Sequence, residues 1–299
     1  MLDTIQGFHI EPTNICTLKC PRCSRTDFIN QFGNKWTNKN LNLDDFKNFL
    51  DIDLDNKVFY ICGMYGDPIY YKDLIPMVAW LKSKQALVTI VTNGSYQQPA
   101  WWQELCDLLS SDDRLHFSID GIPENFTQYR INADWHSIQE GVKIAVASEA
   151  TVAWKYIPFS FNQDNIEQAR QLSKDLGVDE FQLTPSDRFS SDTDWLLPSD
   201  SLVHKKSESK IVWSKAADKE IDPICINTNR EHFISADGLY FPCCLMSDYR
   251  FYYKSQFYKN KEKYKISNTT ISALLETEEF YKNINKTKTD CCTFNCPQL

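Results

Sequence analysis

Short apolar runs alternate with segments of helical periodicity along the first 185 residues. The apolar runs lie at residues 7–10, 58–62, 86–91, 115–119, 151–157 and 180–183. Their length and their content of Val, Ile and Phe predict strands. The clearest helical spacing is that of Ile138, Val142 and Ala145. Six alternations predict a parallel sheet and are too few for a closed eight-stranded barrel, so we expect an α/β fold, a partial (β/α)6 TIM-like barrel.

The alternation stops near residue 185, which predicts three segments. Residues 1–185 form the partial barrel. Residues 186–224 mix Ser, Asp, Lys and Pro without sustained periodicity, which indicates a linker with one short helix. Residues 225–299 are rich in cysteine and lysine and too few to bury a large core. Such a segment usually needs a metal to hold it together.

Basic and aromatic residues interleave between Tyr249 and Lys265. This pattern fits an amphipathic helix that packs its aromatic rings on the small domain and leaves its lysines in water. The alternative is a surface for single-stranded nucleic acid or an acidic peptide. We favour the amphipathic helix.

Composition and charge narrow the function classes. The chain has 299 residues, is 42% hydrophobic and carries a formal charge of −8, which argues against a nucleic-acid partner. No apolar run has the length of a membrane helix, and the first residues lack the layout of a signal peptide, so we expect no membrane and a cytoplasmic protein. Eleven cysteines in such a protein indicate metal binding or catalysis rather than disulfides.

Three of these cysteines, Cys16, Cys20 and Cys23, follow the first predicted strand. Three thiolates are one short of a tetrahedral zinc site or a four-cysteine cluster. A [4Fe–4S] cluster held by three thiolates keeps one iron open for another ligand. The loop therefore predicts a cluster at which chemistry occurs.

Polar residues follow the next three predicted strands. They are Gly66-Asp67-Pro68, then Asn93-Gly94, then Ser118 and Asp120 before Gly121. Turn formation alone explains any one of them. Ligands of parallel α/β sheets collect at the carboxyl ends of the strands, so three in succession favour a binding site.

The C-x-x-x-C-x-x-C loop with these strand-end motifs resembles the radical S-adenosylmethionine (radical SAM) superfamily. The resemblance implies a [4Fe–4S] cluster on the three cysteines, with SAM on the open iron. It also implies contacts with SAM by Gly66, Asp67, Pro68, Asn93, Ser118, Asp120, Arg130 and Lys155. The alternatives for the last two are a surface arginine at a helix start for Arg130 and a snorkelling lysine for Lys155. Two departures from the family pattern are Arg22, where an aromatic residue is usual, and Asp67, where Glu is commoner.

A second set of cysteines lies near the end of the chain. A predicted hairpin at residues 237–243 presents Cys243, and the other members are Cys225, Cys292 and Cys296, with Cys291 and Cys244 as alternatives. The set resembles the twitch form of the SPASM domain and implies one auxiliary iron–sulfur cluster of the [4Fe–4S] type. Structural zinc is the competing interpretation, and a reduced tail without metal is the third.

These features predict an enzyme, by resemblance a radical SAM oxidoreductase or peptide-modifying enzyme. It would cleave SAM reductively to a 5′-deoxyadenosyl radical and abstract hydrogen from a peptide or protein. Alternatives are dehydrogenation or rearrangement of a small sugar-like or nucleotide-like molecule, and a non-catalytic, metal-stabilised binding module. An electron donor such as flavodoxin or ferredoxin is the implied partner. Cys62 is a buried small hydrophobe or a hydrogen-donating thiol in the site.

Overall fold

One sheet organises the protein in the computed structural model, which describes residues 2–186, 189, 194–203, 220–223, 225, 232–279, 281–282, 286 and 288–296. The sheet has eight strands in the order β6-β5-β4-β3-β2-β1-β7-β8. The strands are β1 (Gly7–Ile10), β2 (Val58–Ile61), β3 (Leu87–Thr92), β4 (Arg114–Ser118), β5 (Thr151–Tyr156), β6 (Glu180–Leu183), β7 (His232–Ile234) and β8 (Tyr240–Phe241).

Strands β1 to β6 pair in parallel with their neighbours, which confirms the predicted partial barrel. The tail adds to the same sheet, because β7 pairs in parallel with β1 and β8 pairs antiparallel with β7. The division into three domains stays a prediction. The hydrogen bonds between β1 and β7 nevertheless join the first and third segments directly.

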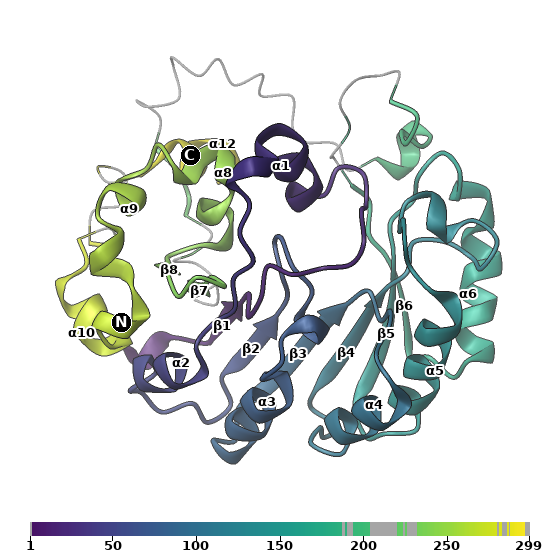
Figure 1. The fold of residues 1–299 in the computed structure, drawn as a ribbon, viewed down its shortest axis with the longest axis horizontal. Coiled ribbons are helices and arrows are strands. Elements are labelled where there is room, and N and C mark those ends of the chain that lie inside the picture. The colour runs from purple at the N-terminus through teal and green to yellow at the C-terminus, as the bar shows by residue number, and fades with distance from the viewer. Residues whose placement is uncertain are drawn as a thin grey trace.

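Helices cover the outer face of the curved sheet, and α1 lies over its other side (Figure 1). The helices are α1 (Ser24–Phe32), α2 (Leu43–Phe49), α3 (Leu74–Ser83), α4 (Pro99–Cys106), α5 (Trp135–Val146) and α6 (Ile166–Asp175). The core lies between the sheet and the outer helices, where Phe8, Phe59, Ile90 and Phe117 are buried. Because strand side chains alternate, the residues between these point to the opposite, concave face.

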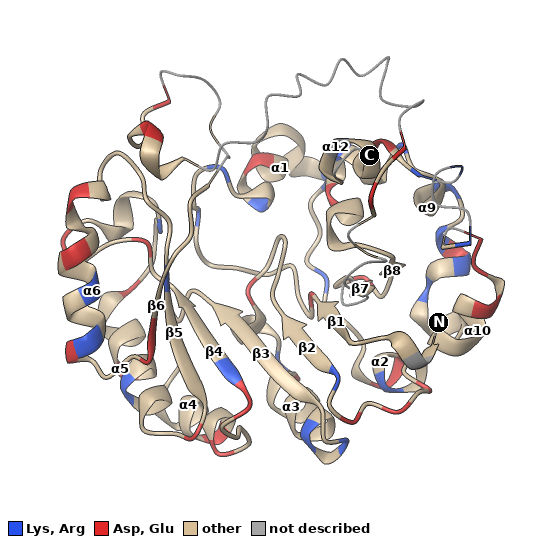
Figure 2. Ribbon diagram, turned by 180° about the vertical axis from the view of Figure 1, so that it is seen from behind, with Lys and Arg blue, Asp and Glu red and all other residues tan. Residues whose placement is uncertain are grey.

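Local capping explains where several helices begin. The side chain of Asn42 accepts the N–H of Asp45 at the start of α2, and Asp134 accepts the N–H of Ser137 at the start of α5. The sequence did not lead us to expect α1 or α2, although Asn42 before an acidic first turn is a start signal for α2. Charged residues lie mainly on the outer helices and connecting loops, while most of the strand ribbon is uncharged (Figure 2).

The tail departs from one expectation and meets another. The hairpin forms, with Gly238 at a φ of 70° between β7 and β8. A single helix over 249–265 is wrong, because new caps at Asp248 and Ser255 start separate short helices. These are α8 (Tyr249–Tyr252), α9 (Gln256–Lys259) and the 3-10 turn η8 (Lys261–Tyr264), followed by α10 (Ile271–Thr277) and α12 (Asp290–Asn295).

Of the predicted linker, the described part contains the 3-10 turn η6 (Asp200–Leu202), and most of the rest falls outside the described residues. In the part of the chain that the structure describes, we find no helix with the length and apolar character needed to span a membrane.

Candidate active site

The three cysteines lie in one loop that connects the carboxyl end of β1 to α1. The N–H of Cys23 donates to the carbonyl of Cys20 at 3.3 Å, which holds the second and third cysteines in a tight turn. Burial raises the pKa of Cys16 to about 12 and that of Cys20 to about 11. The protonated thiols must therefore lose their protons when a metal binds.

Arg22, between the second and third cysteines, adopts a left-handed backbone with a φ of 61°. Its Nη2 lies 2.6 Å from Oδ2 of Asp194, whose side chain is fully buried. This ion pair ties the cysteine loop to a segment 172 residues away. The residue that departs from the family pattern thus holds the loop to the rest of the chain.

Asp67 orients Asn93 toward the cysteine loop. The buried Asp67 carboxylate accepts hydrogen bonds from Oγ1 of Thr92 at 2.7 Å, and from the backbone N–H and Nδ2 of Asn93, both at 2.6 Å. The same Nδ2 lies 3.8 Å from the sulfur of Cys16. The Asp67 side chain is therefore engaged within the protein, and Asn93 faces the cluster site.

The loop after β2, residues 62–67, is held against β1. Oε1 of Glu11 accepts the N–H groups of Tyr65 at 2.6 Å and Gly66 at 3.2 Å. A Cβ at Gly66 would overlap the carbonyl of Thr13, so only glycine permits this close approach. Burial raises the pKa of Glu11 to about 7. Sequence reasoning missed Glu11, although a carboxylate directly after a buried strand was a signal.

Asp120 and Arg130 form a buried ion pair beside the second cysteine. Nη2 of Arg130 lies 2.5 Å from Oδ2 of Asp120, whose side chain is fully buried. Nη1 of Arg130 lies 3.9 Å from the sulfur of Cys20. Burial raises the pKa of the Asp120 carboxyl, and the Arg130 guanidinium opposes that rise. The pair places a positive charge next to the cluster site.

The three cysteines, Asp67, Asn93, Asp120 and Arg130 line one cavity of about 530 Å³. Of the residues expected to contact SAM, all but Pro68 line it, because Pro68 is buried in the turn that follows the loop. Cys62 also lines the cavity, as do Cys244 and Leu245 from the tail. The structure thus brings together the cysteine loop, the strand-end residues and one turn of the tail.

The remaining tail cysteines gather in a separate group. Burial raises the pKa of Cys225 well above its usual value, and the thiols of Cys243, Cys292 and Cys296 raise it further. Burial raises the pKa of Cys291 as well, and again Cys243 contributes. Among the described residues, no three His, Cys, Asp or Glu side chains converge closely enough to hold a single metal ion.

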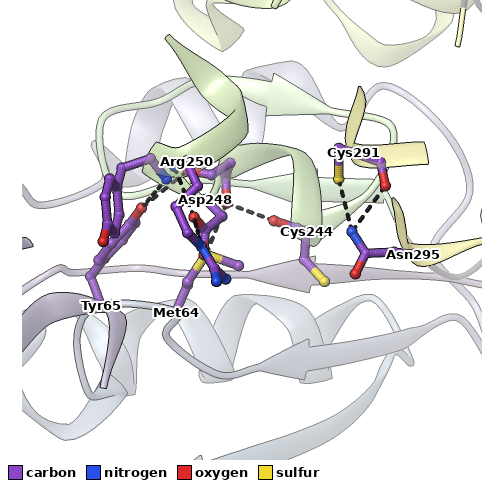
Figure 3. Close-up of polar contacts among 9 residues, drawn as sticks. Met64, Tyr65, Cys244, Asp248, Arg250, Cys291 and Asn295 are labelled. Carbon is purple, nitrogen blue, oxygen red and sulfur yellow. Dashed lines mark hydrogen bonds and ion pairs between the residues drawn. The ribbon is translucent and has the colours of Figure 1, made fainter. Parts of the chain in front are cut away.

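Tyr65 joins the loop after β2 to the tail. Its hydroxyl accepts the N–H of Tyr249 at 2.8 Å and donates to the carbonyl of Ser247 at 3.3 Å (Figure 3). The Ser247 hydroxyl donates to the carbonyl of Cys244 at 2.7 Å. The chain between Cys244 and Tyr249 is therefore hydrogen-bonded to the same loop that Glu11 holds from the other side.

The fold and the site define a class of protein, an α/β partial barrel with a three-thiol site at the carboxyl ends of its parallel strands. Residues 10–176, more than half of the chain, match the family model of the Radical SAM superfamily. The chain belongs to this superfamily, which implies a [4Fe–4S] cluster and SAM. The donor set fits them, because three free thiols of one loop line a cavity large enough for SAM.

Solved structures show the same fold. SuiB of Streptococcus suis bound to S-adenosylmethionine is similar with a TM-score of 0.56 and 15% identity, covering 82% of this chain and 61% of SuiB. BtrN in complex with AdoMet and 2-DOIA is similar with a TM-score of 0.50 and 14% identity, covering 99% of this chain and 94% of BtrN. The sequence matches no curated protein.

Proposed function

We propose that this chain cleaves SAM reductively at a [4Fe–4S] cluster held by Cys16, Cys20 and Cys23. When bound, cluster and cofactor supply a 5′-deoxyadenosyl radical, which abstracts a hydrogen atom from the substrate. The observation that carries this proposal is that the three thiols and the polar strand ends line one cavity. The protein's part is to bind and orient the cofactor and to exclude water.

The proposed SAM contacts divide by what their atoms can offer. Backbone oxygens of Gly66 and Asp67 would hold the ammonium, with Pro68 fixing the turn behind them. Asn93 is oriented by Asp67 beside Cys16, which suits a donor near the cofactor. Arg130 lies against Cys20 and has further donors for a carboxylate, and Ser118 offers an oxygen to the ribose. Asp120, whose buried carboxylate pairs with Arg130, would act by holding that arginine in place.

For the tail we propose one auxiliary [4Fe–4S] cluster on Cys225, Cys243, Cys292 and Cys296, with Cys291 as the alternative to Cys292. Its support is that the thiols of Cys243, Cys292 and Cys296 lie near enough to the buried Cys225 to raise its pKa. Cys244 lines the other cavity, which favours its neighbour Cys243 as the ligand. Such a cluster would accept an electron from the substrate radical or bind the substrate. A flavodoxin or ferredoxin would supply the electron that starts the reaction.

A peptide or protein is the substrate class we propose. The support is that SuiB, which shares the fold, was crystallised with the precursor peptide SuiA. A small molecule is the second candidate, because BtrN, crystallised with 2-DOIA, has nearly the same extent as this chain. These likenesses concern the fold, so the substrate needs its own test.

Anaerobic reconstitution tests the cluster and the reaction together. We expect about eight irons and eight sulfides per wild-type chain, and about four of each after Cys16, Cys20 and Cys23 are all changed to Ala. Cys243→Ala should also lower the count to about four and retain the SAM-dependent cluster. Bound zinc in place of tail iron would instead indicate the structural site.

Formation of 5′-deoxyadenosine after reduction tests the cleavage itself. Wild type and Cys106→Ala should both produce it, because Cys106 is buried at the end of α4 and does not line the cavity of the cysteine loop. The triple Cys→Ala variant should produce none. A fully loaded wild-type protein that binds no SAM and yields no 5′-deoxyadenosine would overturn the proposal and favour a binding module.

A further inference from the structure

The concave face of the sheet is polar below the strand ends. His9 on β1, Tyr60 on β2 and Lys155 on β5 all line the cavity, together with Cys62 just after β2. His9, Tyr60 and Lys155 belong neither to the cysteine loop nor to a strand-end motif, whereas Cys62 lies in the loop that follows β2. A mainly apolar floor would suffice if this part of the cavity only packed against its surroundings. His9 hydrogen-bonds the carbonyl oxygen of Cys62 and Tyr60 hydrogen-bonds the Cys62 thiol, which leaves Lys155 without a hydrogen-bond partner among the described residues.

Lys155 is the cation of this floor. Its Cα pairs in register with Ser118 of β4 and Gln182 of β6, so its side chain rises from the sheet interior. The residue is partly buried, and within the described residues its ammonium forms no ion pair. Its charge acts on Cys62, on Asp120 at the end of β4 and on His116, deeper in the sheet. The ammonium therefore lies over the concave face beside the end of β4.

Arg130 and Lys155 both line the cavity, but among the described residues only Arg130 contacts the cysteine loop. In the proposed function, the cysteine loop would hold the cluster, and SAM would bring its amino and carboxylate groups to that loop. Nη1 of Arg130 lies 3.9 Å from the sulfur of Cys20. Lys155 has no such contact with the cysteine loop among the described residues, and its charge acts on Cys62 and on Asp120. A carboxylate at the cluster is thus served by Arg130, and Lys155 remains for another anion.

A second polar group lies below Lys155 without a partner. His116 is 8% exposed, and within the described part of the chain neither ring nitrogen has a hydrogen-bond partner. It precedes Ser118 by two residues on β4 and so shares its face of the sheet. Unsatisfied buried polar groups are rare and mark sites where water or a ligand group completes the hydrogen bonds.

We propose that Lys155 binds a carboxylate of the substrate, so that the substrate of this enzyme is an acidic peptide or a small carboxylic acid. The inference rests on the proposed function for the position of SAM. The ammonium holds the carboxylate at the cavity floor, which directs the neighbouring carbon atoms of the substrate toward the strand ends where SAM binds. Lys155 is therefore assigned to substrate recognition, in place of the SAM contact expected from the sequence.

Calorimetric titration of the unreduced, SAM-loaded holoenzyme tests this assignment. One arm compares the capped peptide N-acetyl-Gly-Glu-Gly-amide with its Gln counterpart, and the other compares glutarate with glutaramide. We expect the acid to bind about tenfold tighter than its amide in one of the two arms, because a charged pair in a cavity is stronger than a neutral contact. The arm that shows the preference identifies the source of the carboxylate.

Variants of two lysines complete the experiment. Lys155→Met should abolish the preference for the acid, and Lys155→Arg should retain it. Lys143→Met is the matched control, because Lys143 pairs with Glu140 on the outer face of α5. No preference in either arm, or a preference that survives Lys155→Met, would overturn the inference. If Lys155→Met does not fold, a preference that disappears in Lys155→Gln decides the matter.

The inference and the proposed function fail in different ways. The titrations are repeated without SAM, and 5′-deoxyadenosine is measured in the same wild-type preparation. Cleavage of SAM without any preference for acids rejects only the role of Lys155. A preference for acids that needs Lys155, in a protein that never binds SAM, supports the anion site and rejects the proposed reaction.

Discussion

Removal of Arg130 should expose the cost of burying Asp120 without a counterion. The Asp120 side chain is fully buried and the Arg130 side chain is 16% exposed, at an N–O distance of 2.5 Å. Breaking a buried pair by removing one partner costs about 3–5 kcal/mol, so Arg130→Met should lower the free energy of unfolding by that amount at pH 8. Asp120→Asn should cost only about 1–3 kcal/mol, because the amide keeps an acceptor for the guanidinium.

The loss in Arg130→Met should depend on pH in a defined direction. Without the guanidinium, burial holds the pKa of Asp120 above its unfolded value of about 3.9. A group whose folded pKa is raised destabilises the folded protein only where the unfolded state is ionised, so the loss is absent below pH 3.9. It grows by about 1.4 kcal/mol per pH unit above that, to about 1.5 kcal/mol at pH 5.

Urea unfolding of the metal-free protein, followed by circular dichroism at pH 5 and pH 8, measures both effects. The double variant Asp120→Asn/Arg130→Met should cost less than the sum of the single variants by about 2 kcal/mol, because neither charge is then left alone. Asn is the right replacement, since residue 120 has a φ of 60° and Asn tolerates that conformation. Equal losses at the two pH values, or strict additivity, would refute the reasoning.

Three further changes have measurable outcomes. Gly66→Ala should destabilise the protein by more than about 2 kcal/mol, because the new Cβ meets the carbonyl of Thr13. The same variant should weaken SAM binding in calorimetry. Unchanged stability and binding would contradict this, because they would show that the loop after β2 can shift to accommodate the Cβ. Tyr65→Phe should cost about 1–2 kcal/mol and speed hydrogen exchange of the Tyr249 amide, which loses its acceptor; unaltered exchange would contradict this. Burial lowers the pKa of His116 to about 4, as it does for His9 and His232, so protonation of His116 should contribute up to about 3 kcal/mol to the loss of wild-type stability as the pH drops from 6.5 to 4. His116→Leu should reduce the slope of that part of the profile by the share of one of the three histidines, and an unchanged slope would count against it.

Much of the fold could be read from the sequence, because its strands are short apolar runs bounded by turns. The strands at 7–10 and 180–183 lie as predicted, and the other four differ by one residue at one or both ends. The helices α1 and α2 were not expected, and the single helix over 249–265 was wrong. In each case the local pattern is short, so capping and tertiary packing decide the result.

The functional site, like the fold, could be predicted only in part from the sequence. Strand-end residues could be predicted because parallel strands bring their carboxyl ends together. Glu11, Tyr65 and the pairing of Asp120 with Arg130 could not, because each depends on a contact between loops that are far apart in sequence. No periodicity or spacing encodes such a contact.

The sequence by itself determined the class of this protein, since three spaced cysteines and the ordered strand-end motifs are local and survive any small change in packing. Only the tertiary structure decided that the tail extends the sheet beside β1 and that Cys244 and Leu245 line the cavity of the cysteine loop. The same holds for Lys155, which the alternation of β5 places over the concave face. Pairing of distant strands creates these neighbours, because side chains from separate segments meet only after the sheet has formed.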